Sequence, residues 1–146
     1  MCGIAGLIHR GKSSNVGSEL QQMLQALKHR GPDSTGYALY AENEGKNFIM
    51  RFKVGENVGE GSSSVNEDES VYDERKKLVD SMLSDLGAKI IKEDRLTPYS
   101  FRYEMDFDKD LMEFSKKIES IENVEILSIG KSLELIKDLG DAKVVS

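Results

Sequence analysis

The chain has 146 residues, of which 38% are hydrophobic and 32% are charged, and its formal net charge is −6. The acid excess lies in residues 58–146, which disfavours binding to nucleic acid, because such binding needs clustered cations. No apolar run approaches the roughly 18 residues of a membrane span. One cysteine and two histidines give neither a disulfide framework nor a typical metal site. We therefore expect a cytoplasmic protein with no metal or other cofactor, no membrane contact and no nucleic-acid partner.

The first 54 residues predict a strand, a helix and two more strands. The apolar run 3–8 is typical of a buried strand. A capping box formed by Ser18 and Gln21 predicts a helix over 18–28, whose leucines and methionine recur at i, i+3, i+4 and i+7. The two further strands are predicted over 37–41 and 48–54, with a loop between them.

Residues 55–69 consist almost entirely of glycine, serine, asparagine, valine and acid, and they predict a linker. Beyond this linker, the pattern over 70–140 predicts the order α-β-β-α-β-α, a two-layer α/β unit with its helices on one sheet face. The apolar residues at 141–146 predict the start of one more strand.

The elements of residues 70–140 follow from caps and periodicity. They are a helix capped by Ser70 and ended by Gly87, strands 88–92 and 100–107, a helix capped by Asp108, strand 124–129, and a short helix from Ser132 to Leu139. The buried side of the unit is expected to contain Leu78, Met82, Phe101, Tyr103, Phe107, Leu111, Ile118 and Ile126.

The only cysteine, Cys2, directly follows the initiator methionine. Removal of Met1 leaves a thiol and a free α-amine on the same residue, and such an amine accepts a thiol proton close to neutral pH. A nucleophile that carries its own base supports covalent acyl transfer. A lone cysteine at the start of an apolar strand is usually an ordinary buried side chain, so position alone favours that interpretation over catalysis.

A second motif, His-Arg-Gly-Pro-Asp-Ser-Thr-Gly, occupies residues 29–36 at the end of the predicted helix. Helix termination alone explains these residues, because cations suit the last turn of a helix and Gly31 and Pro32 suit the turn that follows. It does not explain why they occur together with a cysteine at position 2.

Taken together, Met-Cys-Gly-Ile-x-Gly and His-Arg-Gly-Pro-Asp-x-x-Gly resemble the class II glutamine amidotransferases, which are N-terminal-nucleophile hydrolases. The resemblance implies that residues 1–54 begin the type-2 amidotransferase domain, a four-layer αββα sandwich, and that 70–140 is an inserted unit. The fold class that follows is α/β of the α+β type. The long insertion resembles the stand-alone amidotransferase subunits of archaeal-type glutamate synthases.

The resemblance also implies residue roles. Cys2 is the catalytic nucleophile, Arg30 and Gly31 bind the substrate, and His29 and Asp33 give structural support. In the implied reaction, Cys2 attacks the side-chain amide of glutamine and forms a γ-glutamyl thioester, and the released ammonia passes to a synthase domain or subunit.

Parts of the family pattern are missing from the sequence. It has no Asn-Gly dipeptide, which family members place at the oxyanion hole, and no histidine after His29. We interpret the chain as an N-terminal fragment with an incomplete active site, and a decayed protein is the alternative. Two other functions stay open: a catalytically inactive binding or regulatory subunit, and an N-terminal-nucleophile hydrolase that acts on another amide.

Overall fold

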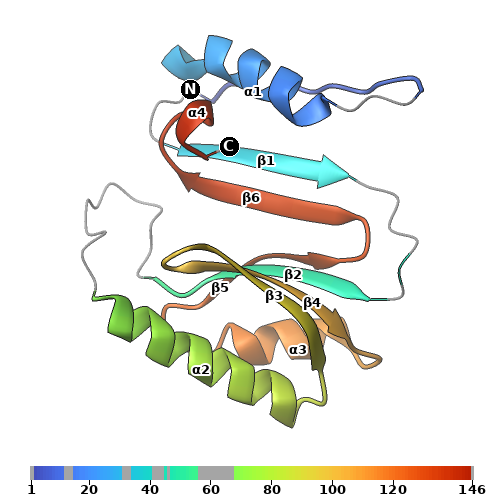
Figure 1. Cartoon of the computed structure of the whole chain (residues 1–146), viewed down its shortest axis with the longest axis vertical. Coiled ribbons are helices and arrows are strands. Elements are labelled where there is room, and N and C mark those ends of the chain that lie inside the picture. Colours follow the sequence, from blue (N-terminus) through green and yellow to red (C-terminus); the bar gives the residue numbers. More distant parts are fainter. Residues whose placement is uncertain are drawn as a thin grey trace. The chain divides into compact units, whose positions relative to one another are not determined.

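The computed structural model describes residues 2–11, 15–30, 34–40, 45, 47–55 and 68–145, without the side chain of Val144. Its contacts divide the chain into two units, Ala38–Ile136 and the combination of Met1–Tyr37 with Lys137–Ser146. Helices and antiparallel sheets both occur, so the α+β fold class predicted from the sequence is confirmed (Figure 1). Most of the predicted linker 55–69 lies outside the described residues.

The larger unit, Ala38–Ile136, is built on a four-stranded antiparallel sheet in the order β3-β4-β2-β5 (Figure 1). Its elements are β2 (Phe48–Lys53), α2 (Glu69–Asp85), β3 (Lys89–Thr97), β4 (Ser100–Asp106), α3 (Leu111–Ile118) and β5 (Glu125–Gly130). The resulting chain order, β-α-β-β-α-β, is that of ferredoxin-like folds. The sequence analysis grouped residues 48–54 with the N-terminal segment and began a separate two-layer unit at residue 70, and these boundaries stay predictions.

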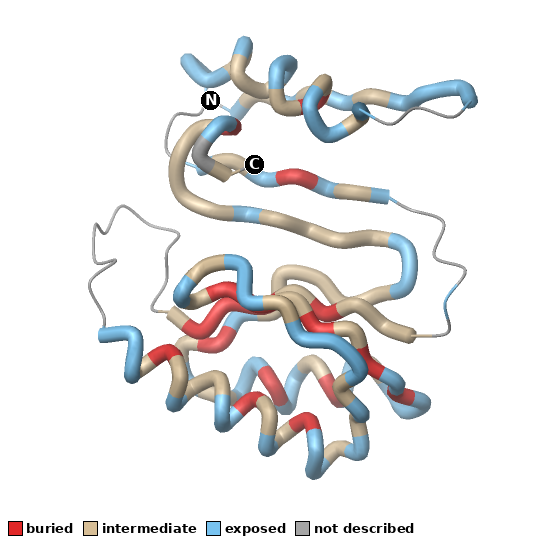
Figure 2. Tube along the Cα trace, viewed as in Figure 1, coloured by how far each residue is buried: buried red, intermediate tan, exposed pale blue. Residues whose placement is uncertain are grey.

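Strand β4 shows the alternation that the sequence predicts. Phe101, Tyr103 and Met105 are buried, and Arg102 and Glu104 between them are only half-buried. In Figure 2 the buried positions of the larger unit lie mainly on its sheet strands and on its helices. The neighbouring strand β2 contributes Phe52, whose ring lies 5.4 Å from that of Phe101 and 5.0 Å, edge-on, from that of Tyr103. These aromatic contacts form the centre of the core, because each buried ring removes a large apolar area from water.

Helices α2 and α3 cover the side of the sheet on which these rings lie. Their buried residues are Tyr72, Val79 and Leu83 in α2 and Phe114 and Ile118 in α3. The expectation that Leu78 is buried is wrong, since its exposed fraction is 57%. Val79 and Leu83, four residues apart, define the inward face of α2, and a neighbour in sequence points about 100° away from them.

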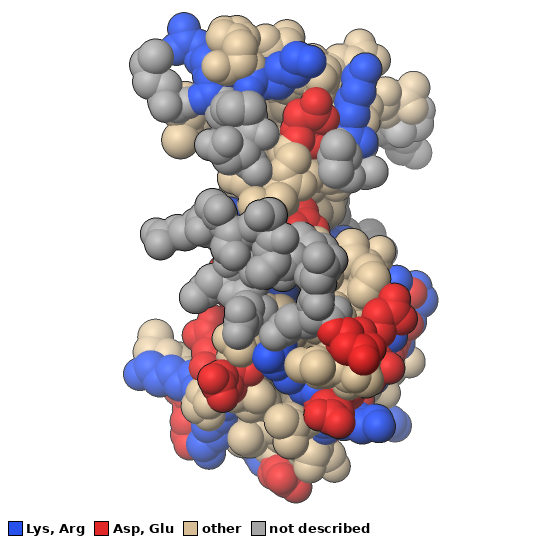
Figure 3. Space-filling model, turned by 90° about the vertical axis from the view of Figure 1, so that its left-hand side faces the viewer, with Lys and Arg blue, Asp and Glu red and all other residues tan. Residues whose placement is uncertain are grey.

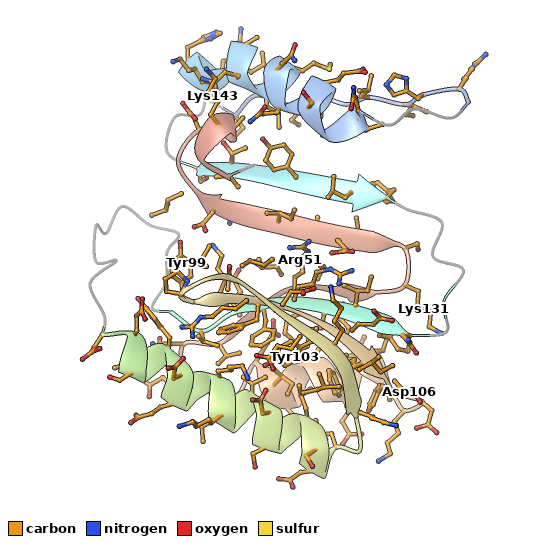
Figure 4. The ribbon with its side chains drawn as sticks, viewed as in Figure 1. Arg51, Tyr99, Tyr103, Asp106, Lys131 and Lys143 are labelled. Atoms are coloured by element: carbon orange, nitrogen blue, oxygen red, sulfur yellow. The ribbon has the colours of Figure 1, made fainter. Side chains whose placement is uncertain are left out.

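Tyr103 carries a polar group into this core. Its side chain is fully buried and points toward α2, where its hydroxyl donates to Asp80 at 2.7 Å (Figure 4). Lys76 contacts Asp80 at 2.7 Å and Glu93 at 3.0 Å, so the carboxylate that accepts from Tyr103 is also paired with a cation. Burial, and then the bond to Asp80, raises the pKa of Tyr103, which keeps the hydroxyl protonated as a donor.

An aspartate caps the N-terminus of each helix of this unit, and in both helices it is a different residue from the cap predicted from the sequence. Asp68 accepts the backbone N–H of Ser70, so Ser70 is the second residue of α2 and not its cap. Asp110 Oδ1 accepts the N–H groups of Met112 and Glu113 at 2.7 and 3.0 Å, and Asp108 therefore lies outside α3. In both segments two side chains of capping type lie two residues apart, and the sequence alone does not separate them.

The end of α2 and the last third of the chain give one confirmation and two corrections. Gly87 ends α2 as predicted, with a φ of +84° that favours glycine. The predicted helix from Ser132 to Leu139 is instead strand β6 (Leu133–Leu139), and where a strand was expected at 141–146 the structure has the short helix α4 (Ala142–Val145). Both segments are short, so contacts with other parts of the chain decide whether each becomes a strand or a helix, and these contacts outweigh the local sequence pattern.

The smaller unit contains α1 (Val16–Ala26) and the one-turn 3₁₀ helix η1 (Lys28–Arg30). Helix α1 starts two residues before the predicted position, with Asn15 preceding it, so the predicted Ser18 cap is wrong. Strand β1 (Ser34–Tyr40) pairs with β6 (Figure 1). The division into two units falls within both strands, after Tyr37 and after Ile136.

Hydrogen bonds join the helices and strands of the smaller unit. The Tyr37 hydroxyl donates to the backbone oxygen of Ala142 at 2.7 Å, and the Thr35 hydroxyl donates to that of Gly140 at 2.8 Å. Gln25 in α1 donates to the Asp141 carboxylate at 3.3 Å. Burial and the negative charge of Asp141 raise the pKa of Tyr37, which favours the protonated donor.

On the side of the four-stranded sheet away from the helices, two arginines face each other. Arg51 of β2 and Arg102 of β4 are register partners, an arrangement that is unfavourable for like charges. Glu134 bridges them: its carboxylate accepts from Arg51 Nε at 2.6 Å and from Arg102 Nε and Nη2 at 2.9 and 3.0 Å. Burial would raise the pKa of Glu134, but the bonds from Arg102 and Arg51 outweigh it and the pKa is lowered.

We expect Glu134→Gln to lower the free energy of unfolding by about 1–2 kcal/mol at pH 7, because it removes the carboxylate that bridges two part-buried arginines and leaves Arg102 with Asp94 at 3.6 Å. A lowered folded-state pKa means that this contribution is full above the ordinary value of 4.5 and is lost as the pH falls through the folded-state value. Urea unfolding of both proteins over this range should show the difference shrinking in acid. A difference that does not change with pH would contradict the prediction.

Candidate active site

The segment that carries Cys2 has no helix or strand over residues 2–9, so the strand predicted over 3–8 is not formed among the described residues. Exposure nevertheless alternates along it: Gly3, Ala5 and Leu7 are half-buried, and Cys2, Ile4, Gly6 and Ile8 are exposed. Ile4 and Ile8 are 91% and 93% exposed. A strand forms only where its backbone pairs with another strand. In the two-stranded sheet of the described residues, β1 and β6 pair with each other and not with residues 2–9.

The residue after Cys2 packs against the end of the first helical region. A Cβ placed on Gly3 would lie 3.1 Å from the Cβ of Leu27 and 3.6 Å from the Cβ of Arg30. The two motifs found in the sequence, which are more than 20 residues apart, therefore meet at Gly3 and Arg30.

The predicted site residues are distributed as follows. Cys2 is an exposed free thiol. His29 and Arg30 are exposed on η1, at the end of the helical region. Gly31 and Asp33 lie outside the described residues, so their predicted roles stay predictions.

A hollow of about 270 Å³ lies beside α1 and is lined by Gln21, Gln22, Gln25, Ala26 and Lys143. None of the predicted site residues lines it. In the described ranges no three His, Cys, Asp or Glu side chains are grouped as metal ligands would be. Among those same residues, no helix combines the length and apolar character needed to cross a membrane.

Charged side chains of both signs are interspersed over the four-stranded unit on the face drawn in Figure 3. Several are paired, as Lys92 with Asp94 at 2.9 Å and Arg95 with Asp73 at 2.9 Å. Such pairs neutralise one another locally and leave the surface with a mixed charge.

Comparison with known proteins bears directly on the segment that includes Cys2 and Arg30. Residues 1–57 match the family model described as "Glutamine amidotransferase domain". The matched range contains both sequence motifs, so the predicted resemblance to glutamine amidotransferases is confirmed at this level.

The chain is also similar to a protein of Methanothermobacter thermautotrophicus that carries the name "Putative glutamine amidotransferase". The two are 32% identical over 150 residues, covering 96% of this chain and 44% of the relative. The chain thus spans less than half the length of this relative. The alignment nevertheless extends well beyond the amidotransferase match and includes the four-stranded unit.

Proposed function

We propose that this chain carries the nucleophile segment of a class II glutamine amidotransferase, an N-terminal-nucleophile hydrolase that withdraws ammonia from glutamine. The observation that carries the proposal is the meeting of the two motifs within the matched range: Gly3, next to Cys2, lies against Arg30. A nucleophile and an arginine on adjoining segments suit an amino-acid substrate, because guanidinium binds carboxylates in a bidentate manner.

In the proposed reaction, the α-amine of processed Cys2 takes the thiol proton and the thiolate attacks the side-chain carbonyl carbon of glutamine. The amine then returns the proton to the leaving nitrogen, the C–N bond breaks, and ammonia leaves a γ-glutamyl thioester. A water molecule, deprotonated by the same amine, attacks the thioester, and its cleavage releases glutamate and restores the thiol. Each turnover consumes one water and one glutamine.

Arg30 and Gly31 are proposed to bind the substrate, Arg30 through its guanidinium group and Gly31 by allowing close approach of the backbone. His29 and Asp33 are proposed to support this turn. Oxyanion stabilisation by one donor contributes about 2.7–4 kcal/mol in acyl-transfer enzymes. None of the residues assigned here supplies that donor, and activity is therefore best measured on the natural full-length gene product.

The finer parts of the proposal concern architecture and partner. We place β1 in one of the sheets of a four-layer αββα sandwich, the architecture that the family resemblance implies. The ammonia acceptor is proposed to be a synthase domain or subunit of the glutamate-synthase type. Activity assays with and without such a partner would test this part of the proposal.

Processing of the N-terminus gives a direct test of the mechanism. We expect active protein to lack Met1, because the free α-amine of Cys2 is the proposed base. Intact-mass spectrometry should show the loss of one methionine residue, and the glutamine-like electrophile diazo-oxo-norleucine should then label Cys2. Active protein that retains Met1 would rule out the terminal-amine mechanism, and a faster reaction with amides other than glutamine would favour a different N-terminal-nucleophile hydrolase.

A further inference from the structure

The segment carrying Cys2 is attached to α1 at two points. Near its start, Gly3 packs against Leu27 and Arg30, and near its end, His9 Nε2 lies 2.9 Å from Glu19 Oε2. The order of these contacts means that the segment runs antiparallel to α1 (Figure 1). Six extended residues span up to about 20 Å, whereas eight residues of helix rise about 12 Å, so both attachments form without stretching the chain.

The contact at Gly3 is close and its partner has little freedom to move. A Cβ at Gly3 would lie 3.1 Å from the Cβ of Leu27, which is tighter than ordinary packing, and 3.4 Å from its Cδ1. The backbone of Leu27 is held on both sides, because its N–H donates to Leu24 at 2.9 Å and its carbonyl accepts from Arg30 at 2.9 Å. An added methyl group at Gly3 would therefore displace the segment rather than the helix end.

We propose that Gly3 is a positioning residue that sets the distance between Cys2 and Arg30, with the contact between His9 and Glu19 as the second fixed point of the segment. The proposal rests on the proposed glutaminase reaction for its kinetic consequence only. The helix end, which carries Arg30, provides the surface against which the backbone next to the nucleophile is aligned. Glycine is required there because any side chain separates the two surfaces.

The same segment offers a matched control. A Cβ on Gly6 meets no atom of the described residues within 4 Å, so Gly6→Ala adds the same methyl group and the same loss of backbone freedom without the contact. We expect Gly3→Ala to lower kcat for glutamine roughly tenfold with little change in KM, because a misplacement of about 1 Å costs about 100-fold and this displacement is smaller. Gly6→Ala should retain the wild-type kcat.

A second measurement does not depend on catalysis. Because Cys2 is the only cysteine, a nitroxide reagent attaches at this position alone. Electron paramagnetic resonance should show a more mobile nitroxide in Gly3→Ala than in the wild type, and an unchanged spectrum in Gly6→Ala. Thermal melts on the same samples identify any variant that has lost its fold.

The outcomes separate the two proposals. If the nitroxide is more mobile in Gly3→Ala and the wild-type protein does not hydrolyse glutamine, the positioning role is supported and the proposed function is ruled out. An active protein in which Gly3→Ala matches Gly6→Ala in kcat and in nitroxide mobility would overturn the positioning role. If Gly3→Ala does not fold, His9→Ala, which removes the second fixed point of the segment, replaces it in the same nitroxide assay. A nitroxide as immobile there as in the wild type would overturn the proposal.

Discussion

Replacement of Cys2 by serine should abolish glutamine hydrolysis by the full-length protein. We expect kcat to fall at least about 1,000-fold, since loss of a catalytic nucleophile costs up to about 10⁶-fold in a well-studied hydrolase. A serine hydroxyl is far less acidic than a thiol, so the α-amine cannot generate an attacking anion from it to the same extent. Initial rates of glutamate formation measure the effect.

The serine change is small, and Cys2 is exposed, so the fold should be unaffected. Equal melting temperatures for the wild type and Cys2→Ser would establish that activity was lost without unfolding. Ser70→Ala provides a control at an exposed residue in the first turn of α2 and should keep wild-type activity. Full activity in Cys2→Ser, or diazo-oxo-norleucine bound to any residue other than Cys2, would show that the nucleophile lies elsewhere.

The experiment also separates the functions that the sequence leaves open. An inactive binding or regulatory subunit predicts no turnover in the wild type, so that Cys2→Ser changes nothing. A hydrolase of another amide predicts that Cys2→Ser abolishes turnover of that amide, with glutamine a poor substrate from the start. Only the proposed reaction predicts that glutamine turnover is both present in the wild type and absent in Cys2→Ser.

The candidate site was predictable from the sequence because its motifs are short and local. Cys2 stands out as the only cysteine, and Arg30 follows a helix whose periodicity is clear. The role that we assign to Gly3 was not predictable, although the residue belongs to the first motif. Its contact with Leu27 depends on how the segment packs against α1, and no sequence pattern reports the distance between two Cβ positions.

The pairing of β2 does not follow from the sequence for a related reason. Residues 37–41 and 48–54 follow each other in the chain with a short predicted loop, which suggests neighbouring strands of one sheet. In the structure β1 pairs with β6, and β2 pairs with β4 and β5. Such pairings between distant residues depend on which apolar faces must be covered together, and local propensity does not contain that information.

Residues 38–136 should unfold cooperatively when produced on their own, whereas residues 70–140 should not fold. The shorter piece lacks β2, which lies between β4 and β5 in the sheet, and β2 is the one partner of β5 among the strands that the structure describes. It also lacks Met50, Phe52 and Val54, whose side chains are all fully buried in the core. Burial of three such side chains contributes about 5–9 kcal/mol, which is comparable to the whole stability of a small domain, about 5–15 kcal/mol.

The sequence placed a boundary after residue 54 and a separate unit at 70–140, and these boundaries stay a prediction until the pieces are compared. Circular dichroism melts and amide exchange of both pieces make the comparison, with residues 70–136 as a control for the contribution of the last four residues. A synthetic peptide of residues 45–57, added in trans to 70–140, should restore helix content and a cooperative melt, because it supplies the missing central strand. Cooperative melting of 70–140 without the peptide would show that β2 is dispensable and that the boundary after residue 54 separates two folding units.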